Sequence, residues 1–340
     1  MKAAVLYGKE TVSVEDVASR ALQSGEVRVQ IEAALTCGTD LKVFKRGYHQ
    51  KMIVPPAMFG HEFAGIIVER APDVIGLQLG DRVVAANSAP CGECFHCHKG
   101  RENLCDDLLF LNGAYAESIV IPKRIVQKNL LCLKPETPFT DAALVEPLAC
   151  VVQGIEDLEF EQGARVLVLG AGPIGLMFVA LTKRLGCFVS VAGRGEKRLH
   201  TAQALGADQV LDIAREPDIT KAASGSVFDV VIEAVGKPET WETAVRLVRK
   251  GGAVNFFGGC PSGTTVTFDT ALIHYSNLRL LASFHHTPRS IRRALEFIEI
   301  KAVRAADFID GACPLSRLPE LFQSMAKGNR AVKTLIQVQG

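Results

Sequence analysis

The segment 165–184 restricts the possible folds of this chain most strongly, because it joins an apolar strand, a glycine-rich turn and an apolar helix. The turn consists of Gly170, Ala171, Gly172, Pro173, Ile174 and Gly175. In such a unit the first glycine permits the tight turn, the second lets the backbone approach a pyrophosphate, and the third allows close contact between helix and sheet. We therefore expect residues 170–175 to bind the phosphates of a dinucleotide cofactor.

Strands and helices continue to alternate after this motif. The expected strands are Arg165–Leu169, Phe188–Ala192, Gln209–Leu211, Phe228–Glu233, Ala253–Phe257 and Leu278–Ser283. The helical segments between them include Leu176–Leu185, Lys197–Leu205 and Glu239–Val248. Strands that alternate with helices form parallel sheets with helices on both faces. The sequence thus predicts an α/β fold with a six-stranded, doubly wound parallel sheet of the Rossmann type.

The first third of the chain has a different pattern, in which short strands are separated by glycine, proline and aspartate turn signals. The expected strands are Lys2–Tyr7, Val27–Leu35, Phe63–Glu69, Arg82–Ala86 and Glu117–Ile121. A helical pattern follows from Thr140 to Gln153, and the last fifty residues return to mixed helix and strand. This pattern predicts a second, β-rich structural part.

Four of the ten cysteines lie in the segment 91–105, which we call the cysteine lobe. They are Cys91, Cys94, Cys97 and Cys105. Four thiolates this close repel one another unless a cation neutralises them, and tetrahedral Zn²⁺ takes four sulfur ligands. A bacterial iron–sulfur run has a shorter final gap, and a haem-attachment CxxCH motif would leave two of these cysteines without a role. We expect a closed, structural zinc site here.

A second set of metal ligands is spread along the β-rich part. Cys37 lies in Thr-Cys-Gly-Thr-Asp, and His61 and Glu62 are adjacent in Gly-His-Glu. A histidine beside a glutamate is by default a polar turn, but a nicotinamide-binding fold with a spare thiol suggests a second metal. One sulfur, one imidazole and one carboxylate leave an open position on Zn²⁺, which is the arrangement of catalytic sites. The other isolated cysteines are expected to be small buried hydrophobic residues: Cys132, Cys150, Cys187, Cys260 and Cys313.

Together these motifs resemble the zinc-dependent medium-chain dehydrogenase/reductase family over essentially the whole chain. The resemblance rests on Cys37-Gly38-Thr39-Asp40, Gly60-His61-Glu62-Phe63-Ala64-Gly65, the cysteine lobe, Glu146-Pro147-Leu148 and the glycine motif. It implies a GroES-like catalytic domain at residues 1–147, completed by 292–340, with a Rossmann domain at 148–291 inserted between them. It also implies a homotetramer or homodimer.

The resemblance implies that Cys37 and His61 bind the catalytic zinc, with Glu62 as a third ligand that can exchange with water or substrate. Glu146 stands where polyol-type members place an acidic residue near the metal, as a ligand or through water. The alternative for Glu146 is a helix carboxylate that is followed by Pro147. The expected complement is thus two zinc ions per subunit.

The resemblance also assigns the proton step. Thr39 occupies the position of the Ser or Thr that takes the alcohol proton. The relay histidine that is common in the family is replaced here by Lys42, so the path of the proton beyond Thr39 stays open. His285 and His286 follow the last expected strand, and because loop histidines more often have no catalytic role, we do not assign them to the site.

The end of the second Rossmann strand indicates which dinucleotide is bound. The acidic residue that holds the adenosine ribose belongs about 20 residues after the glycine motif, at a position that falls on Gly193. Arg194 follows, and Lys197 and Arg198 add positive charge. A missing carboxylate removes repulsion against a 2′-phosphate, and a guanidinium can bind that phosphate through two hydrogen bonds. We favour NADP(H); the alternative is NAD(H), with its ribose held by backbone groups.

Charge and hydropathy limit the partners. With 38 Lys and Arg against 37 Asp and Glu, the net charge of +1 draws the chain neither to nucleic acid nor to a membrane surface. The longest apolar stretch, Val166–Leu181, is too short to span a bilayer. Residues 1–15 lack the features of an export signal, which favours a cytoplasmic protein with reduced cysteines.

We expect a zinc-dependent oxidoreductase that transfers a hydride between a secondary alcohol and NAD(P). The sequence Ala-Ala-Leu-Val-Glu-Pro-Leu at 142–148 resembles the sorbitol-dehydrogenase type, which favours a polyol or sugar alcohol as the small-molecule substrate. The alternatives are an L-threonine 3-dehydrogenase or a general alcohol or aldehyde dehydrogenase. In another class, the alternative is a non-catalytic sensor that binds zinc and nucleotide.

Overall fold

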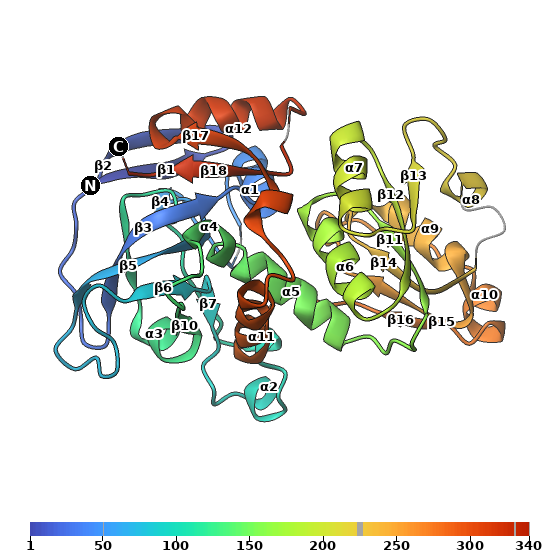
Figure 1. The fold of residues 1–340 in the computed structure, drawn as a ribbon, viewed down its shortest axis with the longest axis horizontal. Helices are drawn as coiled ribbons and strands as arrows, with labels where there is room; N and C mark the ends of the chain where they lie inside the picture. Colours follow the sequence, from blue (N-terminus) through green and yellow to red (C-terminus); the bar gives the residue numbers. More distant parts are fainter. Residues whose placement is uncertain (50, 223–226, 330, 340) are drawn as a thin grey trace. The chain divides into compact units, whose positions relative to one another are not determined.

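The computed structural model describes residues 1–49, 51–222, 227–329 and 331–339, which form two compact units (Figure 1). Unit 1 comprises Met1–Ala149 and His286–Gly340, and unit 2 comprises Cys150–His285. The domain boundaries expected from the sequence lie after residues 147 and 291. Among the described residues, no helix is long and apolar enough to cross a membrane.

Unit 1 is built on β-sheets. A three-stranded sheet has the order β2-β1-β4, and a seven-stranded sheet has the order β10-β6-β5-β3-β18-β17, with β9 also paired to β3. A short pair, β7 and β8, lies apart from both sheets. The strands are β1 (Lys2–Gly8), β2 (Thr11–Asp16), β3 (Val27–Leu35), β4 (Ala57–Met58), β5 (Glu62–Arg70), β6 (Arg82–Ala85), β7 (Ser88–Ala89), β8 (Leu109–Phe110), β9 (Ser118–Ile121), β10 (Leu130–Cys132), β17 (Ile309–Pro314) and β18 (Lys333–Gln337).

The helices of unit 1 are short and lie mostly in the connections between strands. They are α1 (Gly38–Arg46), α2 (Phe95–His98), α3 (Lys123–Asn129), α4 (Phe139–Ala142), α11 (Pro288–Glu299) and α12 (Leu318–Ala326). Three 3₁₀ turns cover Glu102–Leu104, Ala305–Asp307 and Leu315–Arg317. Helix α5 (Val145–Glu156) begins in unit 1 and continues into unit 2.

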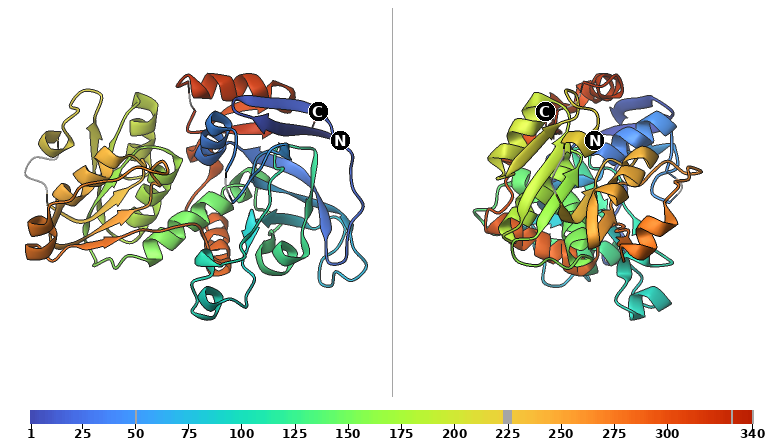
Figure 2. Two further views of the ribbon diagram at one scale, coloured as in Figure 1. Left: turned by 180° about the vertical axis from the view of Figure 1, so that it is seen from behind. Right: turned by 90° about the vertical axis from the view of Figure 1, so that its right-hand side faces the viewer.

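The end of the chain completes the core of unit 1. Strand β18 pairs with β3 in antiparallel register, so that Leu335 is opposite Leu35, and the first and last strands, β1 and β18, belong to the same unit (Figure 2). On α12, Phe322 packs its ring 5.5 Å from that of Phe44 and 5.1 Å from that of Phe59. Large aromatic contacts of this kind bury much apolar surface. The C-terminal segment is therefore part of the core, and it brings its own side chains next to β3.

Unit 2 is a six-stranded parallel sheet with the order β13-β12-β11-β14-β15-β16, which confirms the Rossmann prediction. Helices lie on both faces of this sheet (Figures 1 and 2). The strands are β11 (Arg165–Leu169), β12 (Phe188–Gly193), β13 (Gln209–Asp212), β14 (Phe228–Glu233), β15 (Val248–Phe256) and β16 (Arg279–Leu281). The helices are α6 (Pro173–Arg184), α7 (Glu196–Ala204), α8 (Ile219–Ala222), α9 (Pro238–Leu247) and α10 (Thr270–Tyr275). The strand order reverses between β11 and β14, which is where such sheets bind ligands.

Several details differ from the sequence-based expectations. Strand β16 covers only Arg279–Leu281 of the expected strand Leu278–Ser283. The helix expected from Thr140 to Gln153 is two helices, α4 and α5, because Pro147 is accommodated in the first turn of a new helix that begins at Val145. Strand β15 begins five residues earlier than Ala253, since it continues across a register shift beside β14. Cys132 is exposed rather than buried, because it ends the edge strand β10. Cys150 and Cys260 are only half-buried, whereas Cys187 and Cys313 are buried as expected.

Candidate functional site

Cys37 lies at the junction of β3 and α1. It is the N-cap residue of α1, and its Sγ accepts a hydrogen bond of 3.4 Å from the backbone N–H of Thr39. The partial positive charge of a helix N-terminus stabilises a thiolate. Burial and the charge of Glu62 raise the pKa of the Cys37 thiol, and His61 opposes them. A cation at Sγ would favour the thiolate form that binds metal.

Strand pairing brings His61 and Glu62 to the same place. Glu62 begins β5 opposite Leu35, two residues before Cys37, and His61 is the preceding residue. Their ligand atoms and Sγ of Cys37 all lie within 4.8 Å of one another. The structure therefore brings together three predicted ligands with one sulfur, one nitrogen and one oxygen donor.

A buried chain of hydrogen bonds orients His61. Its Nδ1 lies 2.8 Å from Oδ1 of Asp40, and the hydroxyl of Tyr115 donates to Oδ2 of Asp40 at 2.5 Å and to the carbonyl of Leu35 at 3.1 Å. Burial opposes the charged form of His61, but Asp40 and Cys37 outweigh it and raise its pKa well above the usual value. A carboxylate on one ring nitrogen is the usual support for a metal on the other. Asp40 thus leaves Nε2 of His61 as the ligand atom.

Glu62 is held by a buried lysine from the other end of the chain. Lys333 donates to Oε2 of Glu62 and, at 3.1 Å, to the carbonyl of Thr36. Among the described residues, Oε1 of Glu62 has no hydrogen-bond partner although it is buried. A buried carboxylate oxygen without a partner is costly, and a metal ion would satisfy it. The donor set and this oxygen fit zinc with an open fourth position.

Glu146 does not join this group of three ligands. It lies in the first turn of α5, where one carboxylate oxygen is 3.8 Å from Nε2 of His286. Burial raises the pKa of Glu146 to about 7, although the charge of His61 lowers it. The electrostatic effect of His61 indicates that Glu146 lies near the metal ligands, beside them rather than among them.

Thr39 and Lys42 lie on α1. Thr39, the second helical residue, is half-buried, whereas Lys42 is exposed. The exposure of Lys42 favours a solvated lysine over a buried relay group.

The four cysteines of the cysteine lobe meet at one point, because α2 and the following 3₁₀ turn fold the lobe back on itself. The sulfur of Cys91 lies 3.4 Å from the sulfur of Cys105 and 3.9 Å from the sulfur of Cys97. The sulfurs of Cys94 and Cys97 are 3.6 Å apart. Zn–S bonds of about 2.3 Å in a tetrahedron set sulfur–sulfur distances of about 3.8 Å. All four are free thiols. Their spacing fits a tetrahedral zinc site with four sulfur ligands.

Backbone N–H groups also point at these sulfurs. The amides of Glu93 and Cys94 donate to Sγ of Cys91, each at 3.4 Å, and lower the pKa of this thiol to about 6. Such donors stabilise thiolates before and after metal binding. Burial, by contrast, raises the pKa of Cys97 to about 12 and also raises the pKa of Cys105, so a bound cation is needed to hold all four sulfurs as thiolates.

The glycine motif of unit 2 joins β11 to α6. Gly170 has a φ of +114°, which disfavours any side chain, and a Cβ on Gly175 would lie 1.8 Å from the carbonyl oxygen of Gly170. A Cβ on Gly172 would meet no atom within 4 Å, so space is open above the backbone here. Pro173 and Ile174 form the first turn of α6, whose N-terminus attracts a phosphate.

The end of β12 explains why no acidic residue follows the motif at the expected place. A Cβ on Gly193 would lie only 2.4 Å from Cβ of Ala171, so close packing against the glycine motif excludes a side chain at this position. Arg194 comes next and is exposed, and Arg198 lies half-buried in the first turn of α7. Arg194 and Arg198 therefore place positive charge at this edge of the sheet.

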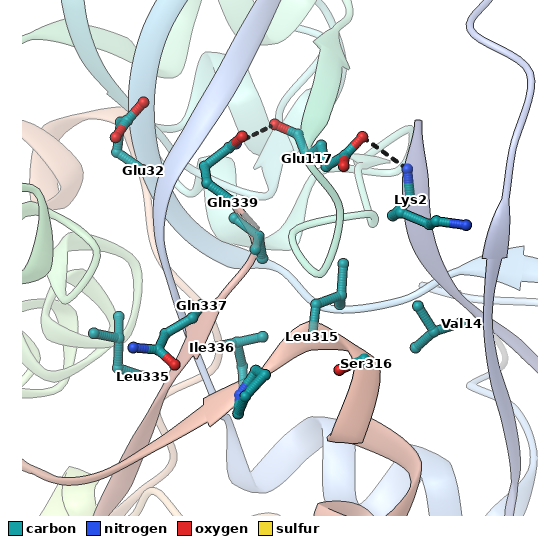
Figure 3. Close-up of a pocket in the computed structure, with 12 residues that line it drawn as sticks. Lys2, Val14, Glu32, Glu117, Leu315, Ser316, Leu335, Ile336, Gln337 and Gln339 are labelled. Atoms are coloured by element: carbon teal, nitrogen blue, oxygen red, sulfur yellow. Dashed lines mark hydrogen bonds between the residues drawn. The ribbon is translucent and has the colours of Figure 1, made fainter.

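A separate open pocket of about 670 Å³ lies between the ends of β1 and β18 (Figure 3). At its rim, Oε2 of Glu117 accepts a hydrogen bond of 2.8 Å from the amide of Lys2, and Nε2 of Gln339 donates to the Glu117 carbonyl at 2.9 Å. None of the predicted ligand or cofactor-binding residues lines it. This pocket is not part of the candidate site.

Sequence reasoning missed three residues that contact the predicted ligands: Asp40, Lys333 and His286. Asp40 was visible as part of the Cys-Gly-Thr-Asp motif, although no role was assigned to it. Lys333 carries a weaker signal, namely a lysine within the apolar strand β18. His286 precedes Thr287, the N-cap residue of α11, and its burial cannot be deduced from a pair of loop histidines.

Comparison with known proteins identifies both units. The family described as "Alcohol dehydrogenase GroES-like domain" matches residues 23–131, and the family described as "Zinc-binding dehydrogenase" matches residues 173–299. These matches agree with the β-sheets of unit 1 and with the parallel sheet of unit 2.

Individual relatives cover most of the chain. An L-threonine 3-dehydrogenase of Pyrococcus horikoshii is 33% identical over 282 residues, which are 80% of this chain and 79% of the relative. A D-altritol 5-dehydrogenase of Agrobacterium fabrum is 34% identical over 310 residues, covering 88% and 89% of the two chains. Among solved structures, a protein described as a zinc-binding dehydrogenase from Sinorhizobium meliloti, bound to NADP, matches with a TM-score of 0.90 and 30% identity over 99% of this chain and 98% of that one.

Proposed function

Because this chain belongs to the zinc-dependent medium-chain dehydrogenase/reductase family, we propose that it oxidises a secondary alcohol, a polyol or sugar alcohol, to the ketone with NADP(H). The proposal depends above all on one observation, the group formed by Cys37, His61 and Glu62, whose Oε1 has no hydrogen-bond partner within the described part of the chain. Three protein ligands leave a fourth position for the substrate oxygen.

Each residue around this group has a defined task. Zinc bound there supplies a Lewis acid that lowers the pKa of an alcohol hydroxyl. Asp40 fixes the ring of His61, and Lys333 holds one oxygen of Glu62 so that the other stays available. Glu146 is a further acidic group beside the ligands, and it interacts with the zinc directly or through a water molecule. The four thiols of the cysteine lobe hold the second, structural zinc.

Thr39 accepts the proton of the substrate hydroxyl in this proposal. It follows Cys37 by two residues at the N-terminus of α1 and is half-buried. The ribose hydroxyl of a bound cofactor would take the proton from Thr39 and pass it to solvent, because Lys42 is exposed and is not a buried base.

Zinc analysis with a substrate panel tests the metal and the substrate class. The panel contains polyols, simple secondary alcohols, ethanol, aldehydes and L-threonine, each with both cofactors. Cys37→Ser should lose turnover and one of its two zinc ions while the fold is kept, because only the open site loses a ligand. Cys132→Ser, at an exposed cysteine, is the matched control. A clear preference for ethanol over every secondary alcohol, or near-normal turnover of Cys37→Ser, would refute the proposal.

L-threonine is the second substrate candidate. The Pyrococcus relative supports it, whereas the Agrobacterium relative, named for a sugar alcohol, supports the polyol. Turnover of L-threonine well above that of every polyol would identify L-threonine as the substrate.

NADP(H) is the proposed cofactor because close packing keeps an acidic side chain away from position 193 and Arg194 follows it. Arg194→Ala should lower kcat/KM for NADP(H) about 10- to 100-fold, as expected for one charge-assisted hydrogen-bonding group, and leave NAD(H) unchanged. Arg184→Ala is the control, since Arg184 is exposed at the opposite end of α6. Equal losses for both cofactors would show that Arg194 does not bind the phosphate.

We also propose a homotetramer or homodimer. Sedimentation of the intact protein measures the assembly, and Cys97→Ser should weaken it if the cysteine lobe lies at a subunit contact.

A further inference from the structure

Glu233 is a buried carboxylate at the end of β14 that the proposed reaction does not use. It is 0% exposed, and strand pairing places it opposite Leu169, the last residue before the glycine motif. It lies within unit 2, as do all the residues that contact it below. Burying a carboxylate is costly unless hydrogen bonds satisfy it. The donors that satisfy Glu233 therefore show which parts of the chain it holds in place.

Three donors converge on Oε1 of Glu233. The amides of Val235 and Gly236 each donate at 2.9 Å, and the hydroxyl of Thr240 donates at 2.6 Å. The amide of Gly236 also lies 3.2 Å from Oε2. Successive backbone N–H groups that point at one place form an anion-binding concavity, and here the anion is the protein's own carboxylate. Glu233 thus fixes the turn 234–236.

Glu233 is also enclosed by the turn 257–259, which follows β15. Its backbone carbonyl accepts from the amide of Gly258 at 2.8 Å, and a Cβ on Gly258 would lie only 2.7 Å from its Oε2. The two turns touch each other, since a Cβ on Gly236 would lie 2.6 Å from the carbonyl oxygen of Gly259. A change in the Glu233 carboxylate would therefore disturb both turns.

Both turns lie at the edge of the sheet that carries the glycine motif. A Cβ on Gly170 would lie 3.0 Å from Cγ2 of Val235, and this apolar side chain is 36% exposed. A dinucleotide lies across the carboxyl ends of the strands where the strand order reverses, with its adenosine ribose at the end of the second strand, here β12. The nicotinamide half then belongs on the side of β14 and β15.

We propose that Glu233 is a positioning residue for the cofactor, whose carboxylate holds the turns 234–236 and 257–259 in the shape that receives the nicotinamide half of the dinucleotide. The inference rests on the proposed function, since it needs a dinucleotide in unit 2. Because Glu233 is buried beneath these turns, it acts through their backbone. Loss of its charge should weaken binding of the nicotinamide half and spare the adenosine half.

The test compares a whole dinucleotide with its adenosine half by isothermal titration calorimetry of the intact protein. The probes are NADPH with adenosine 2′,5′-bisphosphate, and NADH with AMP, so the result does not depend on which cofactor is preferred. Glu233→Gln keeps the shape of the side chain, but its new N–H group faces the amide of Gly236, which contacts both carboxylate oxygens. The Kd of the preferred dinucleotide should rise on the order of tenfold, as expected for the loss of charge-assisted hydrogen bonds, and the Kd of its adenosine half should not change.

Two further variants isolate the cause. Glu239→Gln makes the same change at an exposed carboxylate of α9 and should leave every Kd unchanged. Thr240→Val removes one donor to Oε1 of Glu233, so it should raise the Kd of the dinucleotide by less, and it provides the readout if Glu233→Gln does not fold. A merely structural defect would lower the fraction of protein that binds and would affect a dinucleotide and its adenosine half alike.

The outcomes separate this inference from the proposed function. If the parent binds neither NADPH nor NADH, the proposed function fails and the inference fails with it. If the parent binds a dinucleotide but Glu233→Gln and Thr240→Val bind it with the parental Kd, or lose affinity for the adenosine half to the same extent, only the positioning role of Glu233 is wrong.

Discussion

The pair formed by Lys333 and Glu62 connects the stability of the protein to its metal. Both side chains are buried, with exposed fractions of 1% and 0%. Replacing Lys333 by methionine preserves the shape of the side chain but leaves the Glu62 carboxylate without its cation. Lys333→Met should therefore destabilise the metal-free protein strongly and the zinc-loaded protein much less, because zinc takes over as the counter-charge.

The magnitude follows from the burial of the pair. Removing one partner of a buried ion pair costs about 3–5 kcal/mol, whereas replacing both by neutral groups is often without cost. For a unit of this size the loss corresponds to a fall in Tm of roughly 6–20 °C. The double variant Lys333→Met with Glu62→Gln should recover most of that loss in the metal-free protein.

Urea and thermal unfolding, with and without zinc, measure the effect. The control is Lys9→Met, at an exposed lysine of the same unit, whose effect should stay within about 0.5 kcal/mol. If metal-free Lys333→Met unfolds like the parent, or if the double variant is no more stable than the single one, Lys333 is not the counter-charge of Glu62.

Three other predictions concern separate parts of the chain. Cys97→Ser should lose the zinc of the cysteine lobe and make the lobe sensitive to protease, because a closed site contributes folding free energy; unchanged zinc content would contradict this. Gly193→Ala should cost about 1–3 kcal/mol by overpacking against Ala171, and Ala171→Gly in the same chain should relieve it; urea unfolding that shows no relief would disprove the packing argument. The hydrogen bonds from Arg20 lower the pKa of Glu26 below its usual value of 4.5. Their contribution to the stability of the folded protein is therefore complete above pH 4.5, and it is lost as the pH falls through the lowered pKa. Arg20→Ala should therefore weaken the fall in stability at acid pH. An unchanged dependence of stability on pH in this range would show that the pair of Arg20 and Glu26 does not contribute.

The sequence by itself determined the elements whose cause is local. Val27–Leu35, Arg165–Leu169 and Phe228–Glu233 are strands with the predicted bounds, because each is an apolar run between turn signals. Within the glycine motif, Gly175 must lack a side chain because the carbonyl of nearby Gly170 fills that space. In the cysteine lobe all four thiols lie close in sequence, so a short loop can bring them together.

The supports of the predicted ligands were decided only by tertiary structure. Lys333 lies 271 residues from Glu62, and His286 lies 199 residues from Asn87. Local propensity has no information on such pairs, because their contact depends on which strands become neighbours. Once β18 pairs with β3, Lys333 is placed beside the start of β5. The sequence determined which groups can bind a metal, and strand pairing across the whole chain decided which buried charges hold them in position.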